Sequence, residues 1–456
     1  MFKRLIFLVS LFLMASSVLF AEQLKRAKYV FLFIGDGMSL PQRMIAQNYL
    51  KSLGGDDLLI NSLPVQSITF TKSADSLITD SAASATAIAC GKKTKNHYIG
   101  VDSNGNPLTS TAYVAKKSGR KVGIITSVTL THATPAAFYA HNSNRGNEYE
   151  IALDLVNSGF DYFAGGGIAQ HDNKNAKSFK GDIYSLAKNS GYSVFVGEKE
   201  FSEISGQKKV IAVENKAWAM PYFIDKKDGL RLADFTRKGI ELLDNPKGFF
   251  MMVEGGKIDW MCHANDVATT IGEILEFDRA VGEAFAFAKK HPKETLIVIT
   301  GDHETGGLTL GFAGTGYKLY PERLKNQTCS YDSFKNKIKD FVKSNSEAVF
   351  DDIKPIIEKS FALKFGAPKD EPMRLSTAET NELKSAFERL KKNPDSSALA
   401  NSALRIFNNK AGIAWTSNAH TALPVATSAY GVNSSIFSGM FDNTDIAKNL
   451  KAVLEK

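Results

Sequence analysis

Four short stretches of the chain are almost entirely hydrophobic, and each ends abruptly at small or polar residues. They are YVFLFIGDG at 29–37, KVGIITS at 121–127, GFFMMVEGG at 248–256 and TLIVITGDH at 295–303. Continuous apolar runs of this length are typical of strands buried on both faces, and helical patterns lie between them. The sequence therefore predicts an α/β fold: a three-layer α/β/α sandwich with a large, mostly parallel central sheet.

The pattern changes between about residues 311 and 411, where polar residues are frequent and strand-like runs are few. One helix is predicted there, because Ser376 and Glu379 can form a capping box ahead of an apolar stripe. The stripe consists of Leu383, Phe387 and Leu390. Residues suited to a functional site occur before and after this segment. We therefore expect a largely helical insertion into a single catalytic domain, residues 22–456, rather than a second domain.

The first 21 residues have the features of a secretory signal peptide. Lys3 and Arg4 precede an apolar stretch, and a possible cleavage site follows Ala21. A membrane anchor is the alternative, but the stretch is short against the roughly 20 residues that a spanning helix needs. The sequence predicts export to the periplasm or the extracellular space, with no membrane anchor after cleavage.

The charge and the cysteine content of the chain exclude few classes of function. The chain has 56 basic and 48 acidic residues, a formal net charge of +8, without long blocks of one sign. The positive net charge is compatible with a small anionic substrate, and it is equally compatible with an ordinary solvated surface. Aromatic and basic residues do not alternate in the way that would indicate nucleic-acid binding, so none is expected. The cysteines, Cys90, Cys262 and Cys329, allow one disulfide at most.

Acidic and histidine residues recur near the ends of the apolar runs. They are Asp36, Glu254, Asp259, His263, Asp302, His303 and His420. Asp259 and His263 are four residues apart, just before a helical pattern, and are predicted to share one face of the first turn of that helix. Carboxylate with imidazole suits Zn²⁺, and oxygen ligands alone suit Mg²⁺. Each residue by itself is more often a helix cap or an ordinary packed side chain. Four carboxylates in one cleft, however, would repel one another without cations.

Two further segments supply chemistry for a phosphate. TDSAASATAIACG at 79–91 places Ser81 at the start of a predicted helix, where backbone N–H groups favour anions. A plain helix cap at Asp80 or Ser81 explains this segment equally well, unless a metal ion lies beside Ser81 to activate it. The segment at 127–145 contains His132, Thr134 and Arg145. A guanidinium binds two phosphate oxygens at once, although Arg145 alone would be taken as a surface residue.

Taken together, these motifs closely resemble those of the alkaline phosphatases. The matching motifs are FIGDGM, TDSAASATA, HATPAA followed by Arg145, VEGGKIDWMCHAND, TGDHETGG and the late His420. They follow the family's order across nearly the whole chain. The resemblance implies hydrolysis of small phosphate monoesters with two Zn²⁺ and one Mg²⁺, and it is compatible with the homodimers common in this family.

The resemblance also implies a role for each residue. Asp259, His263 and His420 would bind one zinc ion, and Asp36, Asp302 and His303 the second, next to the nucleophile Ser81. Asp36, Thr134 and Glu254 would bind magnesium. Arg145 would hold the phosphate while Asp80 helps to orient it. The implied mechanism is a two-step in-line displacement through a phosphoserine.

Two positions differ from the best-known bacterial members of the family. Those enzymes have Asp where this chain has His132, and Lys where it has Trp260. His132 resembles the animal enzymes, and His132 with Trp260 resembles some marine bacterial ones. We expect the two residues to influence the magnesium site and the affinity for phosphate.

Three other functions compete with this interpretation. A phosphodiesterase of the same superfamily would have similar zinc sites, although Arg145, Thr134 and Glu254 favour the more highly charged monoester. A sulfatase is disfavoured, because the residues after Ser81 lack the Arg needed for conversion to an aldehyde. An exported zinc- or phosphate-binding protein without turnover would keep the ligands but would not need Ser81.

Overall fold

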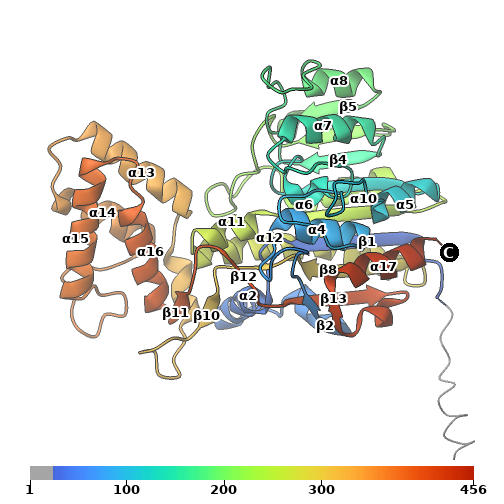
Figure 1. The fold of residues 1–456 in the computed structure, drawn as a ribbon. Helices are drawn as coiled ribbons and strands as arrows, with labels where there is room; N and C mark the ends of the chain where they lie inside the picture. Colours follow the sequence, from blue (N-terminus) through green and yellow to red (C-terminus); the bar gives the residue numbers. More distant parts are fainter. Residues whose placement is uncertain (1–23, 456) are drawn as a thin grey trace, which may run out of the picture.

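The four hydrophobic runs form the middle of one large sheet (Figure 1). They are the neighbouring strands β8 (Thr295–Gly301), β1 (Tyr29–Gly35), β7 (Phe249–Gly255) and β3 (Lys121–Thr126). All three pairings between them are parallel. The structure is a computed structural model that describes residues 24–455, so the predicted signal peptide lies outside the described residues.

Six further strands bring the sheet to ten. Next to β3 come β4 (Tyr162–Gly165), β6 (Val210–Val213) and β5 (Ser193–Val196), and next to β8 come β13 (Val425–Gly431), β2 (Val65–Phe70) and β14 (Gly439–Asp442). Strand β13 is antiparallel to both of its neighbours, and the remaining pairs are parallel. The predicted mostly parallel sheet is confirmed.

Side chains of the central strands divide between two hydrophobic cores, one on each face of the sheet. In β1, Tyr29, Phe31 and Phe33 belong to one core, and the alternate residues belong to the other. The first face is covered by α2 (Leu40–Ser52), α3 (Leu59–Ser62), α9 (Gly197–Phe201), α10 (Leu232–Leu243) and α12 (Val267–Lys290). The second is covered by α4 (Ser81–Cys90), α5 (Thr111–Lys117), α6 (Ala133–Ala136), α7 (Glu148–Asn157), α8 (Ile183–Asn189) and α17 (Asn443–Leu454). The protein thus has the three layers expected from its sequence.

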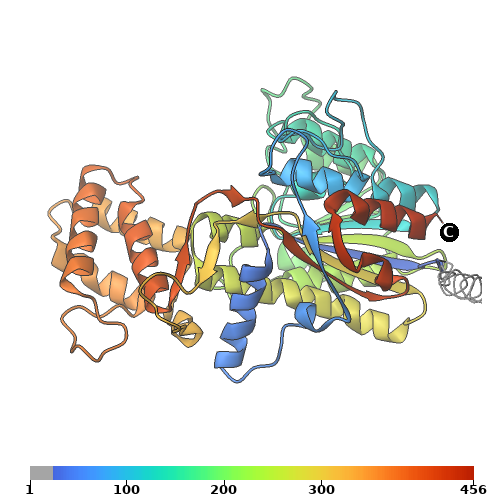
Figure 2. The ribbon, with the colours of Figure 1, turned by 60° about the horizontal axis from the view of Figure 1, so that its bottom comes forward.

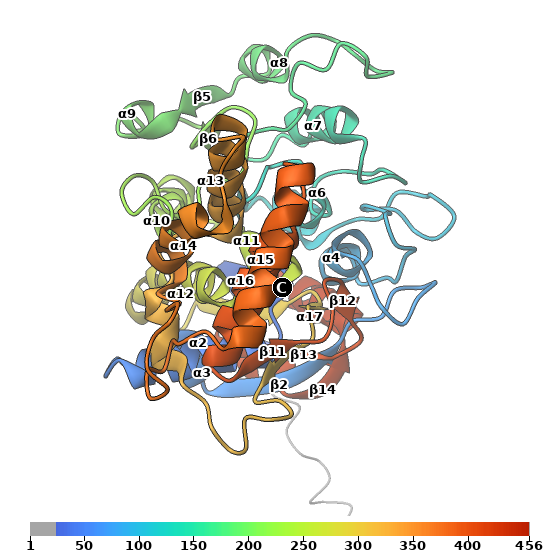
Figure 3. The same cartoon turned by 90° about the vertical axis from the view of Figure 1, so that its left-hand side faces the viewer.

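A helical segment lies beside the sandwich, at the left of Figures 1 and 2 and in front in Figure 3. It contains η1 (Pro321–Asn326), α13 (Tyr331–Ser344), α14 (Phe350–Phe361), α15 (Thr377–Lys392) and α16 (Ala398–Lys410). The chain enters and leaves it through the antiparallel strands β10 (Leu308–Leu310) and β11 (Ile413–Trp415). Helix α15 is the predicted helix, with Ser376 as its N-cap and Glu379 completing the capping box.

The three cysteines are buried free thiols. Within residues 24–455, no helix combines the length and the hydrophobicity needed to cross a membrane.

A close approach between two chain segments occurs just after β1. Gly37 has a φ of +70°, and a Cβ added to it would lie 2.8 Å from the Cα of Asp259. Asp259 belongs to α11 (Lys257–His263), which follows β7. Because only glycine fits there, the turn after β1 can pack directly against the helix that carries Asp259 and His263.

We predict that Gly37→Ala lowers the free energy of unfolding and the bound metal content more than Gly54→Ala does. Gly54 has a similar φ of +76° but nothing within 4 Å of an added Cβ, so its substitution carries only the backbone strain, about 1–2 kcal/mol. Gly37→Ala adds the clash with Asp259 and should also weaken metal binding. Equal losses in the two variants would show that the close approach is unimportant.

Candidate metal centre and active site

The candidate ligands gather at the carboxyl ends of the central strands. Asp36 follows β1, Glu254 lies near the end of β7, and Asp302 and His303 follow β8. Three groups of side chains result, and within each group the candidate ligand atoms all lie within 4.8 Å of one another. The groups are Asp259, His263 and His420; Asp36, Asp302 and His303; and Asp36, His132 and Glu254. Parallel strands thus bring together residues that are remote in sequence.

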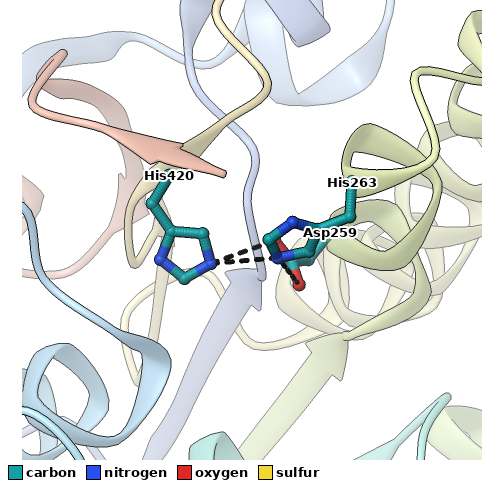
Figure 4. A group of neighbouring side chains, drawn as sticks. All are labelled: Asp259, His263 and His420. Carbon is teal, nitrogen blue, oxygen red and sulfur yellow. Dashed lines mark hydrogen bonds and ion pairs between the residues drawn. The ribbon is translucent and has the colours of Figure 1, made fainter. Parts of the chain in front are cut away.

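In the first group, the imidazoles of His263 and His420 face each other, with the Asp259 side chain next to His263 (Figure 4). The two Nε2 atoms are 3.2 Å apart, and His263 Nε2 is 3.3 Å from Asp259 Oδ2. Each Nδ1 instead contacts a backbone carbonyl, at 2.6 Å from Asn418 for His263 and at 2.8 Å from Thr79 for His420. A carbonyl only accepts hydrogen bonds, so each Nδ1 carries the proton and each Nε2 lone pair of the neutral ring points into the group.

Asp259 and His263 share a helix face, as predicted, but the predicted position in the helix was wrong. They lie on the short helix α11, not in the first turn of the long helix α12. The chain breaks between the two helices at Asn265, whose φ is +56°, and Asp266 caps α12. The apolar positions Ile258, Met261 and Cys262 would continue at residues 265 and 266, which are Asn and Asp. An Asn at a helix end followed by an Asp N-cap is the sequence signal that indicates the break.

A short two-stranded ladder brings His420 to the site. Strand β12 (His420–Thr421) pairs with β9 (Glu304–Thr305), and the rings of His303 and His420 stack with centroids 3.6 Å apart. Glu304 is fully buried and accepts hydrogen bonds from Gln42, Thr421 and the backbone N–H of Gly307. Glu304 therefore holds this ladder in place. Our sequence analysis did not single it out, although it lies within the TGDHETGG motif.

The second group lies directly beside Ser81. His303 Nε2 is 3.2 Å from Asp36 Oδ1, 3.3 Å from Asp302 Oδ2 and 3.2 Å from Ser81 Oγ. Thr305 was also missed by the sequence analysis: its hydroxyl donates to Asp259 Oδ1 at 2.5 Å and lies 3.2 Å from His303 Nδ1. Through Thr305 and the stacked histidines, the first and second groups form one continuous polar site.

The third group differs from the expected magnesium ligands by including His132. Its Nδ1 lies 3.5 Å from Glu254 Oε1 and 3.8 Å from Asp36 Oδ2, to which Thr134 donates at 3.3 Å. The other Glu254 oxygen accepts from Thr126, at the end of β3. Trp260 contacts the ring of His132, with centroids 6.3 Å apart. The Nδ1 of His132 is thus a candidate ligand for an ion in the third group, and the Trp260 ring packs edge-on against the His132 ring.

Ser81, Asp80 and Arg145 meet at the start of α4. Asp80 is the N-cap of this helix and accepts from the backbone N–H of Ala83 through Oδ1. Its other oxygen accepts from Arg145 at 3.1 Å, and the second guanidinium nitrogen of Arg145 is 3.3 Å from His132 Nε2. Asp80 therefore serves both as the helix cap and as the anchor of Arg145.

Several ligand-type atoms of the site are buried without a hydrogen-bond partner among the described residues. They are Asp36 Oδ1, Asp302 Oδ2, Glu254 Oε1 and His132 Nδ1. Buried polar atoms are normally paired, because an unpaired one loses its interaction with water without compensation. Here each belongs to one of the three groups, and cations between the group members would satisfy them. The donor set, carboxylates with imidazoles, fits zinc and other divalent ions.

The pKa values of two histidines in the site are shifted by the closely spaced charges around them. Burial opposes a charge on His303, but the carboxylates of Asp302 and Asp36 outweigh it and raise the pKa of His303 to about 10. Burial and the neighbouring His303 lower the pKa of His420 to about 4. The site holds protons where cations would bind, so metal affinity should fall as the pH is lowered. Fold and site together define an α/β protein with three adjoining groups of side chains that could hold metal ions.

Comparison with known proteins agrees with this class. Residues 27–456 match the family model for alkaline phosphatase. The chain is 33% identical over 445 residues to alkaline phosphatase 3 of Bacillus subtilis, covering 94% of this chain and 89% of that protein. Its fold is similar to that of a cold-active alkaline phosphatase from a psychrophilic Shewanella species, with a TM-score of 0.80, 30% identity and coverage of 94% of this chain and 100% of the other.

A second solved structure is also similar to this chain. The alkaline phosphatase of the Antarctic bacterium TAB5 has a TM-score of 0.68 and 28% identity, covering 95% of this chain and 99% of that one. Two variants of that enzyme replace a histidine by Glu or Asp and have magnesium bound in a site named M3. From these comparisons, the chain belongs to the alkaline phosphatase family and is a phosphoric monoester hydrolase.

We predict that chelation of divalent metals abolishes phosphatase activity and lowers the thermal unfolding midpoint. Without cations, the buried carboxylates of the three groups repel one another. Ions present at about 1,000 times their Kd would add about 4 kcal/mol to the free energy of unfolding. Calorimetry before and after chelation, and after metal is restored, measures this. An unchanged midpoint would contradict a metal centre at these residues.

Proposed function

We propose that this protein hydrolyses phosphate monoesters to an alcohol and phosphate through a covalent phosphoserine on Ser81. The observation that carries the proposal is the 3.2 Å between Ser81 Oγ and His303 Nε2, inside the group that also contains Asp36 and Asp302. Ser81 is 2% exposed and is the first residue of α4. A buried hydroxyl at a helix N-terminus, next to a metal-binding group, has the surroundings that a serine nucleophile requires.

The three groups divide the proposed metal ions between them. Asp259, His263 and His420 would hold one zinc ion, and Asp36, Asp302 and His303 the other. Asp36 and Glu254, with Thr134, would hold a third ion, for which we propose magnesium. Bound metal ions supply Lewis-acid stabilisation of the charge that develops on the attacking and leaving oxygens.

The chain's own residues then account for binding and for the two displacements. Arg145, fixed by Asp80, presents its guanidinium to two phosphate oxygens. Ser81 Oγ gives its proton to solvent and attacks phosphorus. The bond from phosphorus to the alcohol oxygen breaks, and the leaving alkoxide takes up a proton from water to become the alcohol. Water next attacks the phosphoserine from the opposite side, the bond from phosphorus to Ser81 breaks, and phosphate leaves. The helix N-terminus at Ser81 stabilises negative charge in both steps.

We predict that Ser81→Ala abolishes turnover of p-nitrophenyl phosphate, by at least about a thousandfold, while metal content stays at the level of the unmodified protein. Ser110→Ala is the matched control: Ser110 is also a buried serine at a helix N-terminus, and its hydroxyl donates to the Phe138 carbonyl. That variant should lose stability, about 1 kcal/mol, but keep its activity.

Three outcomes would contradict the proposal. Full activity in Ser81→Ala would exclude Ser81 as nucleophile. No hydrolysis by the metal-loaded, unmodified protein would favour a binding protein without turnover. Faster hydrolysis of bis(p-nitrophenyl) phosphate than of the monoester would favour a phosphodiesterase.

The affinity of the third group for magnesium depends on His132. We propose that His132 plays the part of the histidine replaced in the TAB5 variants. An imidazole within reach of Asp36 and Glu254 supplies nitrogen, which magnesium binds less readily than oxygen. The identity of this residue would then control which ion occupies the third group.

We predict that His132→Asp raises the magnesium content of the purified protein, because it replaces a nitrogen ligand with a carboxylate. Elemental analysis after equilibration with equal zinc and magnesium measures the change. His132→Asn, which removes the imidazole without adding a charge, is the control and should gain less magnesium. The same zinc-to-magnesium ratio in all three proteins would contradict this role of His132.

A further inference from the structure

His97 has a backbone conformation that residues with a side chain rarely adopt, and it lies beside the candidate active site. Its φ is +70°, in the left-handed region. A side chain makes this region unfavourable, so a residue other than glycine stays there only where its surroundings hold it. Such residues are frequent at functional sites. The contacts of His97 show what holds it in this conformation.

The backbone of His97 bonds both members of the ion pair between Asp80 and Arg145. Its N–H donates to Asp80 Oδ2 at 3.0 Å, and the same oxygen accepts from the Arg145 guanidinium at 3.1 Å. Its carbonyl accepts from the backbone N–H of Arg145 at 3.0 Å. The three residues are therefore joined by a closed ring of hydrogen bonds.

The left-handed conformation allows both of these backbone bonds. The angle φ sets the direction of the N–H relative to the rest of the residue, so a change to negative φ turns the N–H away from Asp80 while the carbonyl still faces Arg145. The imidazole takes no part in the ring. Its side chain is 70% exposed, and Nδ1 lies 3.8 Å from Asp80 Oδ2, beyond hydrogen-bond distance. The contribution of His97 to the site thus comes from its backbone.

The neighbours of this residue fasten the same segment to both sides of the site. Asn96 Oδ1 accepts from the backbone N–H of Asp80 at 3.0 Å, at the start of α4. Ile99 pairs with Asn142 through two backbone hydrogen bonds of 2.8 and 2.9 Å, three residues ahead of Arg145. The segment therefore joins the start of α4 to the loop that carries Arg145.

Arg145 benefits from such support because it is a long side chain on a partly exposed loop. Its side chain is 27% exposed, and a long side chain samples many rotamers unless it is held. Asp80 holds the guanidinium, and His97 holds the backbone at the other end of the same side chain. A guanidinium fixed in this way is already oriented for two phosphate oxygens, which lowers the entropy lost on binding.

From these contacts we propose that His97 is a positioning residue for phosphate binding. Its left-handed backbone fixes Asp80 and Arg145 relative to each other, so that the guanidinium is in place before the phosphate arrives. This role rests on the proposed function, in which Arg145 binds the phosphate of the ester. The affinity for phosphate then depends on the backbone conformation at residue 97 and not on the imidazole.

The test changes how readily residue 97 adopts the left-handed conformation, and it measures the Kd of inorganic phosphate for the metal-loaded protein by titration calorimetry. His97→Gly adopts this conformation without strain and should keep the Kd within about twofold of that of the unmodified protein. His97→Val is β-branched and should raise the Kd about tenfold, the effect of weakening one charge-assisted hydrogen bond. His97→Ala should give an intermediate Kd, and it remains informative if His97→Val does not fold.

Two controls separate this role from a general effect on folding. Tyr317 is an exposed residue in the loop between β10 and η1 and has a similar φ of +54°. Tyr317→Val introduces comparable strain there and should leave the phosphate Kd unchanged. In an Arg145→Ala background, His97→Val should have no further effect on the Kd, because the guanidinium that residue 97 positions is gone. The metal content should be the same in all of these proteins.

The remaining outcomes would each overturn a specific statement. A phosphate Kd that neither His97→Val nor His97→Ala changes would overturn the positioning role. Equal losses of affinity in His97→Gly and His97→Val would overturn it too, because the imidazole would then be responsible. An equal effect of His97→Val with and without the Arg145 guanidinium would indicate a general distortion of the site and would also overturn it. Failure of the metal-loaded, unmodified protein to hydrolyse p-nitrophenyl phosphate would overturn the proposed function, while the phosphate Kd values would still test His97.

Discussion

The constraint on which this structure depends is the placement of four buried carboxylates beyond the carboxyl ends of the central strands. Asp36, Glu254 and Asp302 are fully buried and Asp259 is 4% exposed, so water does little to screen their mutual repulsion. Parallel neighbours β8, β1 and β7 end together, which makes this crowding unavoidable once each strand is followed or ended by an acidic residue. Bound cations would offset the repulsion, and the imidazoles between the carboxylates would complete their coordination.

The surrounding structure holds these groups at fixed positions. Gly37 lets the turn after β1 meet α11, and Glu304 fixes the ladder that carries His420. Asp80 joins the helix start at Ser81 to Arg145 through two hydrogen bonds. Each of these residues orients a candidate ligand or Ser81 without belonging to one of the three groups. Such positioning matters because a metal site and an in-line reaction both tolerate little displacement of their atoms.

The helical segment lies close to the loop that follows His263, and the two share a cavity. The metal groups are built entirely from the sandwich and from the ladder β9 and β12, whereas the neighbouring cavity also takes a wall from α16. The candidate metal ligands thus come from the sandwich and the ladder, while the helical segment beside them helps to line a separate cavity. This separation is a general property of α/β folds, in which loops and insertions at the strand ends adapt one scaffold to different ligands.

The sequence by itself determined the central strands, the two-sided burial of the sheet and the types of ligand. These follow from local properties: long apolar runs that end in Asp, Glu or Gly, and a helix with its cap. Spacing paired Asp259 with His263, and the resemblance to a family assigned the other members of the groups except His132. The break between α11 and α12 has a local signal too, because Asn265 and the N-cap Asp266 interrupt the apolar pattern between the helices.

Only the tertiary structure decided the rest. It placed His132 beside Glu254 and Asp36, assigned Thr305, Thr126 and Glu304 their contacts, and formed the cavity against α16. The physical reason is that these contacts join segments far apart in the chain. Their distances depend on how strands and helices pack, and a pattern of hydrophobic and polar residues carries no information about that packing.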